Sequence, residues 1–335
     1  MNIFITGIAG FLGSHLAEEC IKNGHNVYGN DNFLGGYKDN IPEEAKFFNI
    51  DCNDFDKLNN LFNLHNIDIL YHCAATAYEG LSVFSPNFVT KNIFQSSVSV
   101  FSAAINNKVK RIIFCSSMAR YGKINPPFDE DSIPNPVDPY GIAKLAAENV
   151  LIALCKLNSV EWAIAVPHNI VGPKQKYDDP YRNVMSIIIH KMLKNENPII
   201  YGDGEQKRCF SFVKDCISPL YKMMISAKAN KQIINIGPDE GTITINELVN
   251  LCANYLQYNG EPIYFKDRPL EVKNAYCSSD KARKLLDYKT TTTIENAITE
   301  TAKYIKSKGI KDFEYNFKIE IDNSLTPKTW KNKII

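Results

Sequence analysis

The sequence predicts an α/β protein in which helices cover both faces of a parallel sheet, and three observations support that fold class. β-rich runs alternate with helical patterns through the first half of the chain, which is the rhythm of βαβ units. Runs such as 111–115 (RIIFC) are almost wholly apolar, as expected for strands buried on both sides. A glycine-rich turn at 7–13 directly follows the first run, as it does in doubly wound sheets.

We expect the strands of this sheet in the first half of the chain, with helices between them. Their ranges are 2–6, 26–31, 46–50, 67–73, 111–116 and 161–167. After Gly172 prolines and glycines interrupt the chain more often, and further strand and helix patterns appear at 232–236 and 247–256. The last twenty or so residues form a polar tail with scattered aromatic residues, for which we expect no place in a core.

The length of the chain favours two domains. At 335 residues it exceeds what one hydrophobic core usually organises. We expect a first domain from residues 1–172 and about 210–238, built on the parallel sheet. A smaller α/β domain, from about 173–209 and 239–335, is expected to bind the substrate.

Charge and composition exclude several classes of partner. The chain has 38 Lys and Arg against 37 Asp and Glu, so no summed field attracts nucleic acid or an anionic membrane. It shows no leader and no apolar segment of membrane-spanning length, which predicts a soluble, cytoplasmic protein. Nine cysteines without CxxC pairs and six dispersed histidines predict neither a disulfide framework nor a metal site.

The glycine-rich turn predicts a dinucleotide site. Residues 6–13 (TGIAGFLG) follow a strand and open a helix, whose free N–H groups and dipole suit a pyrophosphate. Asp31 closes the second strand, and a carboxylate there binds the ribose 2′-hydroxyl and repels a 2′-phosphate, which favours NAD over NADP. Asp51, after the third strand, is a second candidate, for the adenine. The alternative is that these are ordinary turn residues.

A tyrosine and a lysine at helical spacing suggest proton transfer. In 138–144 (DPYGIAK) Asp138 suits the N-cap and Pro139 the first helical position. Tyr140 and Lys144 then share one helix face, so the ammonium is expected near the phenol, where it favours the phenolate. Ser117, at the carboxyl end of a strand, is expected to reach the same oxygen. A packed ring with a snorkelling amine is the alternative.

On these residues the chain resembles the extended short-chain dehydrogenase/reductase family, in particular its NAD-dependent nucleotide-sugar epimerases and dehydratases, from Met1 to about Tyr304. The resemblance implies a doubly wound parallel Rossmann sheet that holds NAD, and a homodimer. It implies Ser117, Tyr140 and Lys144 as catalytic residues. The cofactor contacts it implies are Gly7, Gly10, Phe11, Leu12, Gly13, Asp31, Asn32, Asp51, Cys52, Ala74, Ala75, Asn92, Ser116, Tyr140, Lys144 and Pro167.

The resemblance also implies contacts to a nucleotide-diphosphate sugar. These are Ser117, Met118, Asn169, Asn183, Arg208, Arg268 and Glu271. Arginine suits a diphosphate because its planar fork offers two donors to fixed oxygens. Without the resemblance, each of these charges is as well explained as a solvated loop residue.

The residues after Ser117 narrow the reaction. Related dehydratases carry an Asp-Glu pair at the two positions that follow Ser117. Decarboxylases carry a glutamate at the second of these positions, and C3/C5 epimerases carry a cysteine there. This chain has Met118 and Ala119 at the two positions. The resemblance therefore implies epimerisation at C4, in which Tyr140 deprotonates the 4-hydroxyl while NAD takes the hydride. A 4-keto sugar then turns over and is reduced on its other face. The alternatives are a 4-dehydrogenase or 4-ketoreductase with net redox, and a non-catalytic NAD sensor.

Three further expectations concern surfaces and context. The charged loop 174–182 (KQKYDDPYR) is expected to be a solvated face, with a grip on sugar hydroxyls as the alternative. Helices near 92–105 and 140–156 are expected to form the dimer seam, since the first is rich in serine and alanine. The family suggests polysaccharide biosynthesis, and the sequence leaves the base and the sugar open.

Overall fold

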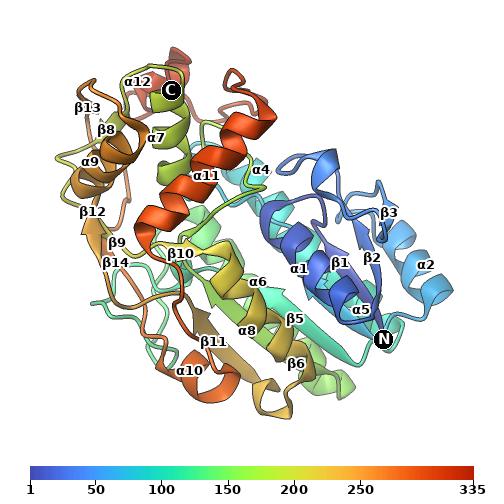
Figure 1. Ribbon diagram of the computed structural model, residues 1–335. Helices are drawn as coiled ribbons and strands as arrows, with labels where there is room; N and C mark the ends of the chain where they lie inside the picture. Colours follow the sequence, from blue (N-terminus) through green and yellow to red (C-terminus); the bar gives the residue numbers. More distant parts are fainter.

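The computed structural model describes the whole chain, residues 1–335, and its centre is one parallel sheet (Figure 1). The strands are β1 (Asn2–Thr6), β2 (Asn26–Asn30), β3 (Lys46–Phe48), β4 (Ile69–His72), β5 (Arg111–Cys115), β6 (Glu161–Pro167) and β11 (Gln232–Ile236). Their order is β11-β6-β5-β4-β1-β2-β3, and every neighbouring pair is parallel. The predicted fold class is confirmed, and each of these strands lies within a predicted run.

Two apolar cores lie on the two faces of the sheet, because successive side chains of a strand point to opposite faces. In β1, Ile3 and Ile5 belong to one core and Phe4 to the other. The first core is covered by α1 (Phe11–Lys22), α8 (Val213–Ile225) and α10 (Asp280–Leu286). The second is covered by α2 (Phe55–His65), α5 (Ser96–Asn106) and α6 (Pro139–Asn158). None of the chain's helices has both the length and the apolar character of a membrane span.

A third core lies beyond the carboxyl ends of the strands, where α7, α9 and α11 pack together (Figure 1). These helices are α7 (Val184–Leu193), α9 (Ile245–Leu256) and α11 (Ile294–Lys308). Short strands surround them: β7 (Ile170–Val171), β8 (Ile199–Tyr201), β9 (Lys207–Arg208), β10 (Ser211–Phe212), β12 (Ile243–Thr244), β13 (Ile263–Phe265) and β14 (Asn274–Ala275). The sequence did not predict these strands, because two or three residues leave no periodicity.

The expectation that loop 174–182 is a solvated face is wrong. Tyr177, Asp178 and Asp179 are buried. The tyrosine hydroxyls of Tyr37 and Tyr78 donate to Asp178 and Asp179, each at 2.6 Å. The loop is therefore an internal connection, because its carboxylates have partners on segments that lie far away in the sequence.

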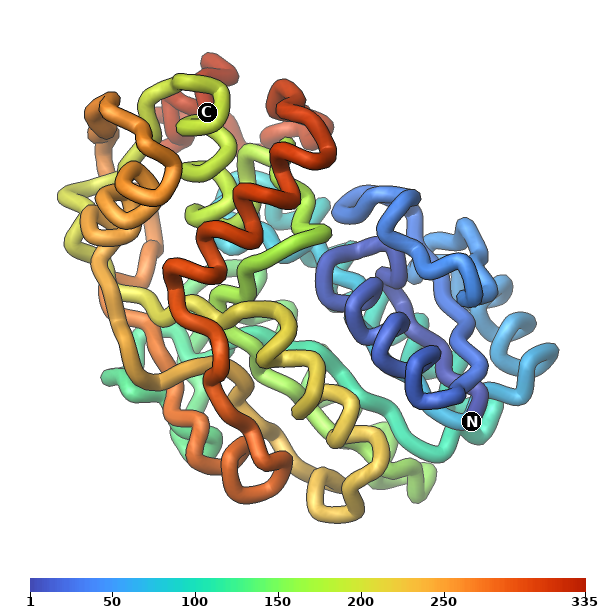
Figure 2. The backbone as a smooth tube through the Cα atoms, in the orientation of Figure 1, coloured from blue at the N-terminus to red at the C-terminus, as the bar shows by residue number.

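The expectation that the tail has no place in a core is also wrong. Phe313, Tyr315, Phe317 and Ile319 alternate with polar residues, so an extended segment turns all of them to one side. They pack on an apolar cluster that contains Tyr140, and Figure 2 shows the segment running back across the top of the molecule. The chain then forms α12 (Lys328–Lys331), in which the Trp330 side chain is only 3% exposed.

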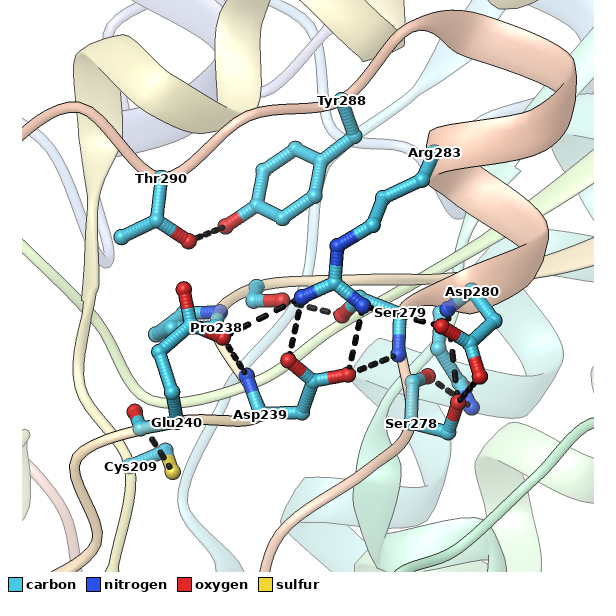
Figure 3. Close-up of polar contacts among 12 residues, drawn as sticks. Cys209, Pro238, Asp239, Glu240, Ser278, Ser279, Asp280, Arg283, Tyr288 and Thr290 are labelled. Atoms are coloured by element: carbon cyan, nitrogen blue, oxygen red, sulfur yellow. Dashed lines mark hydrogen bonds and ion pairs between the residues drawn. The ribbon is translucent and has the colours of Figure 1, made fainter.

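Helix α10 returns to the parallel sheet, although the sequence assigns this stretch to the second domain. Ala282, Leu286 and Tyr288 join the first core. Arg283 is the polar anchor of this helix: it donates to both carboxylate oxygens of Asp239, one bond being 2.8 Å long, and contacts Asp280 at 3.1 Å (Figure 3). Burial would raise the pKa of Asp239, but the bonds from Arg283 outweigh it and hold that pKa well below its usual value.

Replacing Arg283 by glutamine is expected to lower the free energy of unfolding by about 1 kcal/mol, since the pair is partly exposed. The lowered pKa of Asp239 means that this stabilisation is present at neutral pH and is lost as the pH falls through the folded-state pKa. Urea unfolding at pH 7 measures the loss. Lys303→Gln, which removes a more exposed pair with Glu300, is the control and should change less; equal effects of the two variants contradict the assignment.

Candidate active site

A cavity of about 430 Å³ lies at the carboxyl edge of the parallel sheet. Four residues that directly follow strands line it, Gly7, Asp31, Cys73 and Ser116, together with Pro167, the last residue of β6. The chain order reverses between β1 and β4, which is where open α/β sheets bind their ligands. All the predicted site residues except Met118 line this cavity.

The glycine turn has no room for side chains. Gly7 has a φ of +70°, and a Cβ there would lie 2.9 Å from the backbone of Ala74. A Cβ on Gly13 would lie 2.3 Å from the carbonyl oxygen of Gly7. Helix α1 begins at Phe11 without a side-chain cap, so the N–H groups of its first turn remain available. This cradle fits the pyrophosphate of a dinucleotide.

Carboxylates at the ends of β2 and β3 form the next part of the wall. Asp31 is buried and accepts from the N–H of Ala9 at 3.0 Å and of Phe33 at 2.8 Å. Burial raises the pKa of Asp31, and these bonds act against it. Asn32 donates to Asp51 at 2.7 Å, which ties the two strand ends together. The arrangement fits an adenosine with a free ribose diol.

The start of α6 positions the phenol of Tyr140. Asp138 caps the helix by accepting from the N–H of Gly141 at 2.9 Å, and Pro139 occupies the first position, as predicted. Tyr140 is 6% exposed and lines the cavity together with Ser117. The Ser117 hydroxyl accepts from the N–H of Ala119 at 3.1 Å and so caps the short turn Met118–Arg120.

The Lys144 ammonium has a backbone partner that the spacing did not predict. Lys144 donates to the carbonyl of Cys115 at 2.7 Å and lies 4.8 Å from the centre of the Phe114 ring. Burial lowers the pKa of Lys144 to about 8. The pKa of Tyr140 is raised rather than lowered, with burial as the largest cause, while a hydrogen bond with Ser117 acts in the opposite direction. In the protein by itself burial therefore shifts both groups toward their neutral forms, although Lys144, with a pKa near 8, is still mostly an ammonium at pH 7.

A buried ionic network that the sequence analysis missed supports this region. Glu148 is 1% exposed; it accepts from the hydroxyl of Ser116 and from Nε of Arg120 at 3.0 Å. It lies one turn beyond Lys144 on the same face of α6. The network holds the loop after β5, which carries Ser117. The sequence feature that could have predicted this network is a glutamate four residues after Lys144 in a mostly apolar helix.

Two arginines and one carboxylate form the other end of the cavity. Arg268 donates to both oxygens of Glu271, at 2.9 and 3.1 Å, and Arg208 lies 3.5 Å from the same carboxylate. Burial would raise the pKa of Glu271, but Arg268 outweighs it and lowers that pKa. The planar guanidinium groups of Arg208 and Arg268 offer paired donors at this end of the cavity, which suits a diphosphate.

Of the three remaining residues predicted to contact the substrate, two line the cavity and one does not. Asn169 donates to the carbonyl of Cys209 at 2.9 Å, Asn183 caps α7 through the N–H of Met185 at 3.0 Å, and both line the cavity. Met118 does not line the cavity: its partly buried side chain packs against the core that contains α6.

The sheet order, the glycine turn and the cavity at the strand ends together define a Rossmann enzyme that uses a dinucleotide cofactor. The chain belongs to the NAD dependent epimerase/dehydratase family, whose sequence profile matches residues 3–237. Family, enzyme class and NAD dependence were predicted correctly. The glycine cradle and Asp31 fit this cofactor.

Individual relatives agree with this membership. The chain is 35% identical to a putative UDP-glucose 4-epimerase of Methanocaldococcus jannaschii, over 84% of this chain and 92% of that protein. It is 31% identical to a UDP-N-acetyl-α-D-glucosaminuronate decarboxylase of Bacillus cytotoxicus, over 90% and 97%. The crystal structure of the Thermotoga maritima UDP-glucose 4-epimerase with UDP-glucose matches with a TM-score of 0.86 and 30% identity, over 92% and 99% of the two chains.

Replacing Gly13 by alanine is expected to remove bound NAD, because the new Cβ would overlap the carbonyl oxygen of Gly7. The NAD content of the purified protein, measured after denaturation, should fall about tenfold or more. Gly24→Ala is the matched control, since nothing lies within 4 Å of a Cβ there and only its positive φ adds strain. Full NAD content in Gly13→Ala would show that this turn does not bind the cofactor.

The lowered pKa of Lys144 predicts a pH-dependent stability. The group titrates near 8 in the folded protein and near its ordinary 10.5 when unfolded, so the unfolded chain binds more protons between these values. The stability of the wild type relative to Lys144→Met should therefore rise from about pH 8 to 10.5, by roughly 2 kcal/mol. Urea unfolding of both proteins measures the difference, and a difference independent of pH contradicts the burial of a charged Lys144.

Proposed function

We propose that the protein inverts C4 of a UDP-activated sugar through a transient 4-keto sugar. The observation that carries this proposal is the arrangement along one cavity: a glycine cradle, then Tyr140 and Ser117, then the arginine pair. A sugar with its diphosphate at Arg208 and Arg268 extends toward the phenol. The relatives with this fold that act at C4 use UDP-sugars.

Each group in the cavity has a definite task in such a reaction. Bound NAD supplies the acceptor and then the donor of the C4 hydride. Tyr140 takes the proton of the 4-hydroxyl and returns it, and Ser117 donates a hydrogen bond to the same oxygen. Arg182 and Ser117 both lower the pKa of Tyr140, against the larger effect of burial. The arginines hold the diphosphate while the sugar turns, which exposes the other face of its C4 carbonyl.

The residues beside Ser117 favour inversion at C4 over elimination and decarboxylation. Met118 and Ala119 provide no carboxylate for an elimination or a decarboxylation. The Met118 side chain moreover packs against the core and does not line the cavity, and a thioether does not transfer protons. Inversion needs no group beyond Tyr140, Ser117 and the cofactor.

The same proposal includes the domain boundaries, the oligomeric state, the location and the pathway. Residues 1–172 and about 210–238 form the NAD domain, to which α10 adds its apolar side, and the rest of 173–335 binds the sugar nucleotide. A homodimer forms through α5 and α6, which pack against each other and expose Ile142 and Leu157 on α6. We assign a cytoplasmic location and a role in polysaccharide biosynthesis because they are usual in this family.

Replacing Tyr140 by phenylalanine is expected to lower the rate of UDP-glucose and UDP-galactose interconversion by about 100-fold or more, because the proton acceptor is lost. Bound NAD should be retained. The interconversion is measured by chromatography of the two sugars, with Tyr255→Phe, an exposed tyrosine on α9, as the control. Full activity of Tyr140→Phe contradicts the proposal, and stoichiometric oxidation of the sugar by the wild type supports the redox alternative.

A further inference from the structure

Glu79 differs from every other acidic residue around the cavity. It begins α3 (Glu79–Ser82) and lines the cavity wall, but its carboxylate has no hydrogen bond or ion pair with any group of the chain. The other acidic residues of the wall all have partners: Asp31 has Ala9, Asp51 has Asn32, Asp138 has Gly141, and Glu271 has Arg268. A carboxylate without a partner inside a binding cavity is suited to accept hydrogen bonds from a ligand.

Helix α3 lies between the reaction centre and the diphosphate end. On one side, the hydroxyl of Ser82 is 3.4 Å from the carboxylate of Asp138, the residue that caps the helix of Tyr140. On the other side, a Cβ on Gly80 would lie 3.4 Å from Nη1 of Arg268 and from the ring of Trp330. A sugar that joins C4 at the phenol to a diphosphate at the arginines therefore passes alongside α3.

Glu79 forms no direct ion pair with any cation. Enclosure in the cavity raises its pKa to about 7 and the negative charge of Asp138 adds to this effect, while Arg208 and Arg268 lower that pKa from beyond ion-pair distance. Arg182, the other charged residue near the phenol, is already compensated: it pairs with Asp179 at 3.2 Å, donates to the carbonyl of Gly35 and lies 4.8 Å from the Tyr78 ring centre. Once a diphosphate occupies Arg208 and Arg268, as the proposed function requires, the sugar part of the cavity has one anion without a free cation beside it, because Arg182 is paired with Asp179.

We propose that Glu79 determines sugar specificity: it selects a neutral or amino sugar, whose hydroxyl or amine donates to the carboxylate, and it rejects a uronic acid. The assignment rests on the proposed function, because it takes the positions of C4 and of the diphosphate from it. A second carboxylate beside Glu79 would face like charge in a confined space, and such repulsion discriminates between ligands more strongly than the loss of one contact. Glu79 touches the sugar without entering the proton transfer at C4.

The test is the affinity of the NAD-loaded protein for UDP-glucose and for UDP-glucuronate, by isothermal titration calorimetry at about pH 8.5, above the pKa of Glu79. The wild type should bind UDP-glucose about 50-fold more tightly or better. Glu79→Gln keeps the shape of the side chain and removes its charge, so it should reduce that ratio about tenfold. Glu79→Asp should keep most of the discrimination.

Glu43→Gln, at an exposed glutamate without an ion pair, is the matched control and should leave the ratio unchanged. Equal affinities of the wild type for the two ligands, or an unchanged ratio in Glu79→Gln with full NAD content, overturn the role of Glu79 and leave the proposed function intact. Failure of both UDP-sugars to bind contradicts the proposed function, and the role of Glu79 with it. Binding needs no turnover, so the two failures are distinguishable.

Discussion

The hydrogen bond from Lys144 to the carbonyl of Cys115 joins α6 to the end of β5, and the geometry of the reaction centre depends on it. It fixes the start of α6, and hence the phenol of Tyr140, over the carboxyl edge of the sheet. The bond also places an ammonium in a buried position, which lowers its pKa, while the burial of the phenol raises the pKa of Tyr140. Both shifts disfavour charge, so a phenolate needs a positive charge that a ligand brings.

The second half of the chain completes the cavity around this centre. The alternating aromatic residues of the C-terminal segment pack against the cluster that holds Tyr140, and Trp330 lines the cavity beside Gly80. Loop 174–182 is buried beneath them and brings Arg182 to the cavity wall. The wall of the sugar site thus comes from segments outside the parallel sheet, which is consistent with one reaction centre serving different sugars in related proteins.

The sequence predicted those parts of the molecule that local chemistry determines. The sheet followed from runs buried on both faces, and the glycine turn from positions such as Gly7 and Gly13, where the backbone leaves no room for a Cβ. The N-cap and the first turn of α6 followed from Asp138 and Pro139. In each case a few adjacent residues carry the physical reason.

The sequence was less informative where a side chain had a choice of partners. Spacing placed Lys144 and Tyr140 on one face but did not reveal that the carbonyl of Cys115 accepts a hydrogen bond from the ammonium. Met118 was assigned because it follows Ser117, whereas its side chain packs against the core and does not line the cavity. The charges of Asp178 and Asp179 suggested solvent, because their tyrosine partners lie more than a hundred residues away. The tail did carry a signal, a period of two, which its polar composition obscured.

The most direct measurement is the ultraviolet difference titration of tyrosine ionisation, comparing the wild type with Tyr140→Phe, each with and without bound NAD. The account predicts one tyrosine, present only in the wild type, that ionises at distinctly lower pH in the NAD-loaded protein than in the NAD-free protein, where burial keeps the phenol neutral. A Tyr140 that ionises at the same pH in both forms would contradict the claim that the cofactor's charge overcomes the effect of burial.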